Sequence, residues 1–134
     1  ATAGLDPVVR DEILDEFFYF ICDEDHAILI SSHITSDLEK AADYITYLHQ
    51  GRVVLSQPKD ELLDRYGRVG CSTGDLAAIE PGDLLRVRRG TFGCEGLTSD
   101  RDVFQKKYPG LTVDPASLED IMLLIGKGES LCTD

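Results

Sequence analysis

The placement of glycine residues divides this chain into two parts of different character. Up to Tyr66 the apolar residues recur at helix or strand spacing, whereas the stretch that follows is broken repeatedly. The first four breaks are Gly67, Gly70, Gly74 and Gly82. The charge changes at the same point, because residues 1–66 carry 14 acidic and 5 basic residues and residues 67–134 carry 11 and 8. We therefore predict two domains, 1–66 and 67–134, joined near Tyr66.

The net charge and the cysteine content argue against several classes of protein. Acidic residues outnumber basic ones by 25 to 13, for a net charge of −12, which argues against a nucleic-acid-binding surface. No apolar run approaches the roughly 18 residues of a membrane span. The four cysteines form no CxxC pair, so we predict neither a zinc site nor a disulfide framework. The expected location is therefore a reducing cytosol. They are Cys22, Cys71, Cys94 and Cys132.

The first domain begins with the pattern of an amphipathic helix followed by a strand. Asp6 and Pro7 form a typical helix start, with aspartate as the N-cap and proline at the first helical position. Apolar residues then recur at helical spacing over residues 9–21. After a polar turn, the apolar run 27–30 predicts a short strand that is buried on both faces.

His33 follows directly after this predicted strand. In open α/β sheets, ligands bind beyond the carboxyl ends of the strands, so His33 is a candidate ligand-binding residue. The alternative is a loop histidine that only forms a hydrogen bond with the backbone.

Three further elements are expected in the first domain. Ser36 and Glu39 have the spacing of a capping box and predict a second helix. The runs 44–48 and 52–55 predict a β-hairpin, and Pro58 then begins a third helix.

Taken in order, these motifs closely resemble one family. Ala3-Gly4-Leu5-Asp6-Pro7, a helix, and Ile28-Leu29-Ile30-Ser31-Ser32-His33 resemble the D-loop and the H-loop of ABC transporter ATPases. The resemblance continues through residues 36–39 and the hairpin, and it covers residues 2–66. It implies an α/β fold, namely the C-terminal part of a P-loop ABC ATPase domain with a parallel strand and a hairpin among helices.

The resemblance also implies a role for each matching residue. His33 would be catalytic, contacting the γ-phosphate of ATP and holding the attacking water and the transition-state charge in place. The D-loop residues would lie at the interface of two nucleotide-binding domains, beside the bound cofactor. They are Ala3, Gly4, Leu5 and Asp6. Asp6 would also cap its helix, and no metal ligand is expected in this chain.

The same resemblance implies the partners of the full-length protein. That protein would use ATP and Mg²⁺ and pair with a second nucleotide-binding domain as a homodimer. It would power a membrane permease subunit, as a cytoplasmic protein peripheral on the inner face of the cell membrane. No nucleic-acid partner is expected. The alternative from another class is a non-catalytic oligomerisation or ligand-sensing module, with residues 67–128 carrying the activity.

Three ATPase motifs are missing from the sequence. A GxxxxGK[ST] Walker A loop and an LSGGQ-type signature do not occur, and the Walker B strand would lie just before Ala1. Residues 17–24 mimic Walker B because they are an apolar run that ends in Asp-Glu. They follow the D-loop-like segment, however, whereas Walker B precedes it in the family. We therefore expect the C-terminal piece of a longer ATPase, inactive by itself and without bound ATP or Mg²⁺.

The second domain is predicted to be a small α+β accessory domain. Strands are expected at 69–72, 85–88 and 111–113, and a helix at 75–79. Two more helices are expected, one capped by Ser99 and running to Tyr108, and a last one capped by Ser117. Glycines recur at Gly90, Gly93 and Gly96. They favour a hairpin with a bulge over a phosphate-binding cradle, because such a cradle needs a strand-to-helix setting.

Two features of the second domain bear on function. Residues 116–122 resemble the tail of many drug-export and bacteriocin-type ABC ATPases, which implies a prokaryotic exporter of the antibiotic or multidrug class. Arg86, Arg88 and Arg89 either mark a site for an anionic partner or form the solvated face of a strand. The solvated face is favoured, because strands of small domains often have a charged outer face.

Overall fold

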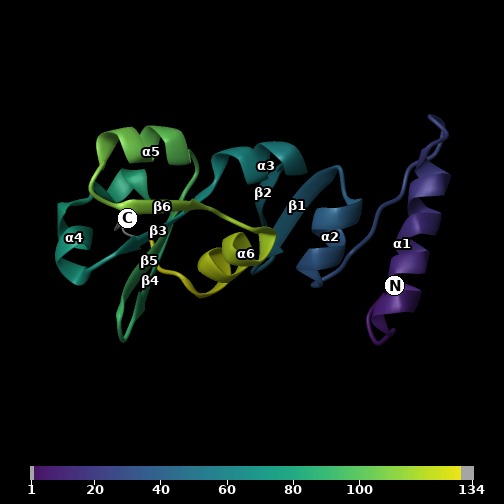
Figure 1. Ribbon diagram of the computed structural model, residues 1–134, viewed down its shortest axis with the longest axis horizontal. Coiled ribbons are helices and arrows are strands. Elements are labelled where there is room, and N and C mark those ends of the chain that lie inside the picture. The colour runs from purple at the N-terminus through teal and green to yellow at the C-terminus, as the bar shows by residue number, and fades with distance from the viewer. Residues whose placement is uncertain (1, 131–134) are drawn as a thin grey trace. The chain divides into compact units, whose positions relative to one another are not determined.

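The computed structural model describes residues 2–130, so residues 131–134 of the predicted second domain, Cys132 among them, lie outside the described residues. The chain divides into two compact units, Ala1–Asp43 and Tyr44–Asp134, here called unit 1 and unit 2. Figure 1 labels their elements. The hairpin groups with unit 2, so this division falls before Tyr66. A domain boundary near Tyr66 in a longer ATPase stays a prediction.

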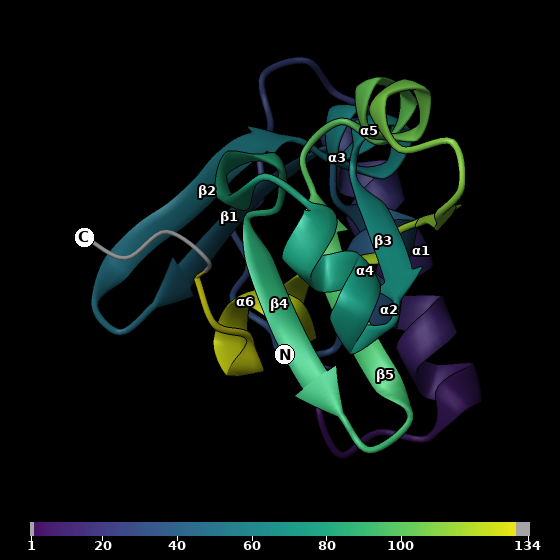
Figure 2. The same ribbon diagram turned by 90° about the vertical axis from the view of Figure 1, so that its left-hand side faces the viewer.

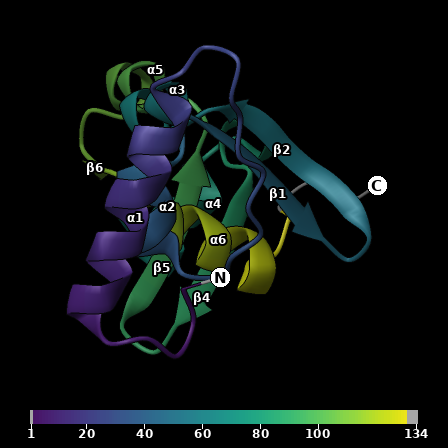
Figure 3. The same cartoon turned by 90° about the vertical axis from the view of Figure 1, so that its right-hand side faces the viewer.

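The described part of unit 1 contains two helices that pack against each other, α1 (Pro7–Ile21) and α2 (Thr35–Ala41) (Figure 3). The start of α1 is as the sequence predicted. The Asp6 carboxylate accepts hydrogen bonds from the backbone N–H groups of Val8 and Val9 at 2.9 and 3.1 Å. These bonds satisfy two of the donors that every helix leaves unpaired at its N-terminus.

The prediction of a buried strand at residues 27–30 is wrong. These residues have no regular secondary structure, and Leu29 is 102% exposed. A strand needs a neighbour to pair with its backbone groups, and no strand within residues 2–130 pairs with this segment. The parallel strand of the predicted fold is therefore not found, and the two sheets of the described chain are antiparallel.

The capping box predicted at Ser36 and Glu39 is also wrong. Helix α2 begins earlier, at Thr35, with Ile34 and not Ser36 at the N-cap position and without a side-chain cap. The hydroxyl of Ser32 instead accepts a hydrogen bond from the backbone N–H of Ile34 at 3.0 Å. Serine side chains often order a chain locally in this way just before a helix.

Unit 2 begins with the predicted hairpin. Strands β1 (Tyr44–His49) and β2 (Arg52–Pro58) pair antiparallel. The turn residues Gln50 and Gly51 both have positive φ, of 50° and 75°. Such a turn matches the natural twist of the two strands. Helix α3 (Lys59–Arg65) follows the hairpin.

A four-stranded antiparallel sheet with the strand order β4-β5-β3-β6 forms the centre of unit 2. Its strands are β3 (Gly67–Cys71), β4 (Arg86–Gly90), β5 (Gly93–Thr98) and β6 (Thr112–Pro115). A hairpin joins β4 to β5 as predicted, but without the predicted bulge, because the register is unbroken up to the pair Gly90 and Gly93. Gly67 has no room for a side chain, since a Cβ there would lie 2.7 Å from the Cβ of Arg101.

Helices cover both faces of this sheet. They are α4 (Thr73–Ala78), α5 (Arg101–Lys107) and α6 (Leu118–Lys127), and a short 3₁₀ helix, η1 (Pro81–Asp83), follows α4. Helices α4 and α5 share a core cluster with Val69, Val87 and Cys94 of the sheet. Figure 2 shows α4 in front of the sheet. Arg68 points to the opposite face, where its Nη1 pairs with Oδ1 of Asp120 on α6 at 3.4 Å.

The helix starts of unit 2 test two capping predictions. Ser117 caps α6 as predicted, with reciprocal hydrogen bonds between Ser117 and Asp120. Helix α5 is capped by Asp100, whose carboxylate accepts from the backbone N–H of Val103 at 3.2 Å, and not by Ser99. The described chain is thus a mixed α/β fold.

Candidate functional site

The segment that resembles a D-loop forms an exposed turn before α1. Ala3 and Gly4 make the turn, and Gly4 has a φ of +81°, a conformation that favours glycine. Leu5 is exposed, and Asp6 caps α1. The backbone of residues 3–6 is therefore shaped by the positive φ of Gly4 and by the helix cap at Asp6.

His33 lies in a bend between the irregular residues 27–32 and α2, and it is exposed. The hydrogen bond from the Ile34 N–H to the Ser32 hydroxyl spans this bend. The residues on either side of His33 are therefore held together, while its imidazole is accessible to a ligand. The structure thus places the candidate histidine on a short ordered loop and not at the end of a strand.

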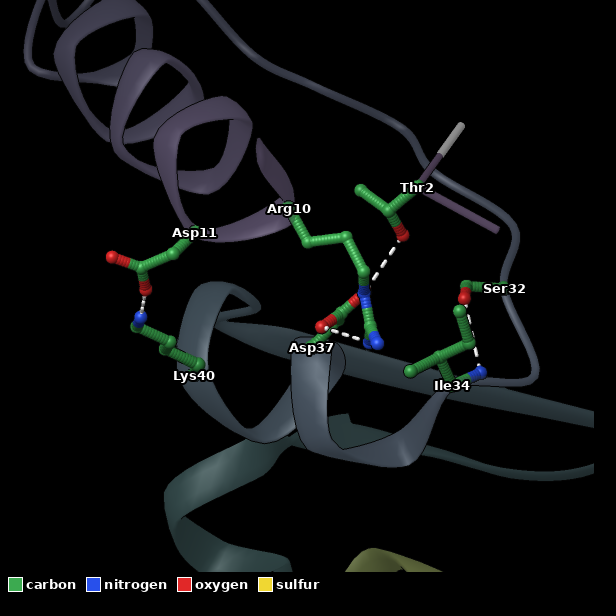
Figure 4. A network of polar contacts seen from close by, with 7 residues as sticks. All are labelled: Thr2, Arg10, Asp11, Ser32, Ile34, Asp37 and Lys40. Atoms are coloured by element: carbon green, nitrogen blue, oxygen red, sulfur yellow. Dashed lines mark hydrogen bonds and ion pairs between the residues drawn. The ribbon is translucent and has the colours of Figure 1, made fainter. Parts of the chain in front are cut away.

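One carboxylate connects the two loops. The hydroxyl of Thr2 donates a hydrogen bond to Oδ2 of Asp37 at 2.7 Å (Figure 4). The Arg10 guanidinium donates from Nη2 to the other oxygen, Oδ1, also at 2.7 Å. Thr2 precedes the D-loop-like turn, Arg10 lies near the start of α1, and Asp37 lies in the first turn of α2. Both sides of the D-loop-like segment are thus tied to the helix that follows His33.

This network is shielded from solvent. Thr2 is 2% and Asp37 is 8% exposed. The hydrogen bond from Thr2 is the largest influence on Asp37 and, together with Arg10, it lowers the pKa of that carboxyl, although burial acts in the opposite direction. Asp37 therefore stays ionised. Loss of its charge would leave a partly buried guanidinium without its partner.

A second ion pair joins α1 to α2. Lys40 on α2 pairs with Asp11 on α1 (Figure 4). Both side chains are about half exposed, so this pair contributes only about 0–1 kcal/mol to stability. Asp37, with its shielded bonds, is the principal polar link between the two helices.

Sequence reasoning proposed His33 and residues 3–6 as candidates but missed this network. The bonds of Asp37 reach back 27 and 35 positions, to Arg10 and Thr2. Neither helical nor strand periodicity relates residues so far apart. The acidic character of the helix after His33 was the only available signal, and it does not identify a partner.

The described residues do not form a complete nucleotide-binding site. An exposed imidazole fits one contact to a phosphate oxygen, because a ring N–H donates readily to an anion. The sequence holds no GxxxxGK[ST] loop to enclose the phosphates. Within residues 2–130, no group of three or more His, Cys, Asp or Glu side chains is placed to hold a metal ion. In the same residues, the helices are too short or too polar to cross a membrane.

The three arginines considered in the sequence, Arg86, Arg88 and Arg89, lie on strand β4. Arg86 donates from Nη1 to the backbone oxygen of Leu85 at 2.8 Å. Arg88 and Arg89 are exposed, and Arg88 lies directly opposite Glu95 in the β4–β5 ladder. This arrangement agrees better with a solvated strand face than with a site for an anionic partner.

Comparison with known proteins identifies relatives of the chain. No protein-family model matches it. It is 38% identical over 126 residues to the energy-coupling factor transporter ATP-binding protein EcfA2 of Clostridium acetobutylicum, which covers 92% of this chain and 38% of that protein. It is 39% identical over 59 residues to the lantibiotic transport ATP-binding protein SrtF of Streptococcus pyogenes, covering 44% of this chain and 25% of that protein.

A third relative is described as an ATP-binding protein of an ABC transporter, without a named substrate. An ABC transporter ATP-binding protein of Mycoplasma pneumoniae is 33% identical over 67 residues, which are 49% of this chain and 21% of that protein. The chain thus spans between about a fifth and two-fifths of the length of these relatives. Their shared description agrees with the D-loop and H-loop resemblance of unit 1. The chain is therefore a relative of the ATP-binding proteins of ABC transporters.

Proposed function

We propose that this chain is the C-terminal part of the ATP-binding subunit of an ABC transporter, which couples ATP hydrolysis to transport through a membrane permease. The observation that carries the proposal is the Asp37 network. It ties a D-loop-like turn to the helix that follows a histidine in an H-loop-like bend. Two loops that must act together in an ATPase are thereby linked within one compact unit.

His33 is the proposed catalytic residue. Its imidazole would donate a hydrogen bond to the γ-phosphate of ATP and stabilise the charge that develops on transfer to water. Ala3, Gly4, Leu5 and Asp6 would face a second ATP-binding domain. ATP and Mg²⁺ would be held mainly by segments outside this chain, so the 134-residue chain alone is proposed to be inactive.

The remaining proposals concern the whole transporter. The subunit would act as a homodimer on the inner face of the cell membrane, in the cytoplasm, and bind a permease subunit. The match to a lantibiotic transport protein supports a transported substrate of the antibiotic class. The tail at residues 116–122 supports export as the direction.

The test is His33→Ala in a longer chain that supplies the Walker A and Walker B segments. ATP turnover should fall at least about a hundredfold, the usual scale for losing one preorganised group from a charge-stabilising site. ATP affinity should change little, because the phosphates are held mainly by the Walker A loop. Turnover, ATP affinity and melting temperature should be measured on the same preparation.

His26→Ala is the matched control. His26 is also exposed, but its Nδ1 contacts the backbone oxygen of Phe20 and its ring stacks on Phe20. Turnover per folded molecule should therefore be kept in this variant. A His33→Ala protein that hydrolyses ATP at the normal rate, with a stability loss of about 1 kcal/mol, would make His33 a structural loop residue and remove the proposal.

A further inference from the structure

Two free cysteines lie opposite each other on neighbouring strands of the sheet of unit 2. Cys71 ends strand β3, and its directly opposed partner on β5 is Cys94. Directly opposed residues of antiparallel strands have Cα atoms about 4.5–5.5 Å apart and side chains on the same face of the sheet. Disulfides span Cα separations of about 4.4–6.8 Å. The register alone therefore brings the two cysteines within the distance that a disulfide bridges.

The two cysteines differ in their exposure to solvent. Cys94 is 5% exposed within the core cluster, whereas Cys71 packs against that cluster and is partly exposed. Solvent can therefore reach part of Cys71, whereas Cys94 lies beside it in the interior. In placement alone, Cys71 is suited to react first and Cys94 to resolve the product as a disulfide.

The backbone around the pair can adjust. Cys71 is the last residue of its strand, and Gly70 precedes it. Gly93 precedes Cys94 and has a φ of +141°, and a Cβ at Gly93 would lie 3.1 Å from the backbone oxygen of Cys71. The two strands therefore approach closely here. Cβ atoms need to move from about 4.5–5.5 Å apart to about 3.5–4.5 Å, and a strand end next to glycines permits such a shift.

We propose that Cys71 and Cys94 form a site of reversible oxidation, with a hydroperoxide as the oxidant. The Cys71 thiolate attacks the peroxide, the O–O bond breaks, and Cys71 becomes a sulfenic acid while an alcohol or water leaves. The Cys94 sulfur then attacks the Cys71 sulfur, the S–S bond forms, and the S–O bond breaks with release of water. The two thiols lose two protons and two electrons in total, and the peroxide gains them.

The bridge would join β3 to β5 covalently, and a thiol reductant would open it. Burial, followed by the nearby Cys94 and Asp75, raises the pKa of the Cys71 thiol. The fraction of reactive thiolate at neutral pH is therefore small. Oxidation of the pair by peroxide is therefore expected to be slow at neutral pH and to become faster as the pH rises.

The test uses the whole 134-residue chain with Cys22→Ser and Cys132→Ser, so that only the proposed pair remains. After treatment with hydrogen peroxide, the protein is denatured and its free thiols are alkylated. Mass spectrometry should find both cysteines protected and joined in one cross-linked peptide, and dithiothreitol should release them. Gel electrophoresis without reductant should show a monomer, since the bridge is internal.

Two comparisons keep the proposal falsifiable. The same double variant should form the bridge more slowly in urea, because the unfolded chain must first close the loop between the two cysteines. Adding either Cys71→Ser or Cys94→Ser should abolish the bridge, and the single thiol left should be alkylated or oxidised further. Equal rates in the folded and unfolded chain would overturn the proposal, as would sulfinic acid at Cys71 without any cross-link.

Discussion

At the scale of single residues, Asp37 provides the main shielded polar contact of unit 1. Its two carboxylate oxygens each accept a short hydrogen bond, one from Thr2 and one from Arg10. Most of the other apolar and charged side chains of this unit are exposed, with Leu14 as a buried exception. A shielded polar contact therefore has more influence here than it would in a protein with a large core.

The first prediction at this scale is that Asp37→Asn loosens the contact between α1 and α2. Loss of a charged hydrogen-bond acceptor leaves Arg10 without its partner and should cost about 1–3 kcal/mol. Amide hydrogen exchange in α1 and α2 should accelerate accordingly, whereas the sheet of unit 2 should exchange as before. Asp15→Asn, at an exposed position of α1, is the control. Unchanged exchange in the Asp37 variant would contradict the structural role assigned to it.

The same residue predicts a pH dependence. The pKa of Asp37 is lowered in the folded chain, so the folded state binds fewer protons than the unfolded state around that pKa. Its stabilising contribution is fully present above the ordinary aspartate pKa of about 3.9 and is lost as the pH falls through the folded value. Acid should therefore speed hydrogen-exchange openings of α1 and α2 in the parent chain. The Asp37→Asn variant should show less of this acid dependence.

At the scale of elements, the two helices α6 and α2 differ in whether a local cap or a tertiary contact stabilises them. Helix α6 has a complete capping box at Ser117 and Asp120, and four of its apolar residues are buried. Helix α2 lacks a side-chain cap and instead depends on its contact with α1. Sequence motifs of the same kind therefore have different consequences in the two helices.

We predict that Ser117→Ala lowers the free energy of unfolding of unit 2 by about 1 kcal/mol, because a capping side chain is lost. Ser36→Ala, which removes the serine of the box that does not form, should have almost no effect. Urea denaturation followed by circular dichroism measures both variants under the same conditions. Equal losses from the two substitutions would show that the α2 cap forms after all.

At the scale of the whole molecule, unit 1 exposes much apolar surface. Tyr19 and Leu29 are 77% and 102% exposed, and an open apolar depression on this unit is lined by Phe17, Phe20 and Ile28 among others. Surfaces of this kind commonly mediate association. We therefore predict that the chain forms dimers or larger species in solution.

Light scattering over a concentration series tests this prediction. The apparent mass should rise above the 14.8 kDa of one chain as concentration increases. Tyr19→Ser together with Leu29→Ser should weaken the association. Phe92→Ser is the control, because Phe92 is 103% exposed but lies at the tip of the β4–β5 hairpin in unit 2. A constant mass near that of one chain would refute the prediction.

The sequence by itself determined the features that depend on neighbouring residues. Asp6 and Pro7 start α1, Ser117 starts α6, and the turn at Gly51 joins the first hairpin, all as predicted. Each feature is local, because a cap or a tight turn satisfies backbone groups within a few positions. The D-loop and H-loop resemblance is likewise a matter of residue order, and the ATP-binding relatives found by comparison agree with it.

Only the tertiary structure decided the features that need a distant partner. The run at residues 27–30 has the composition of a strand, but a strand requires backbone groups from another strand, and no strand of the described chain pairs with it. Asp37 acquires its importance from Thr2 and Arg10, and Cys71 from the register that sets Cys94 opposite it. Composition determines which residues are able to pair. The path of the folded backbone determines which of them meet.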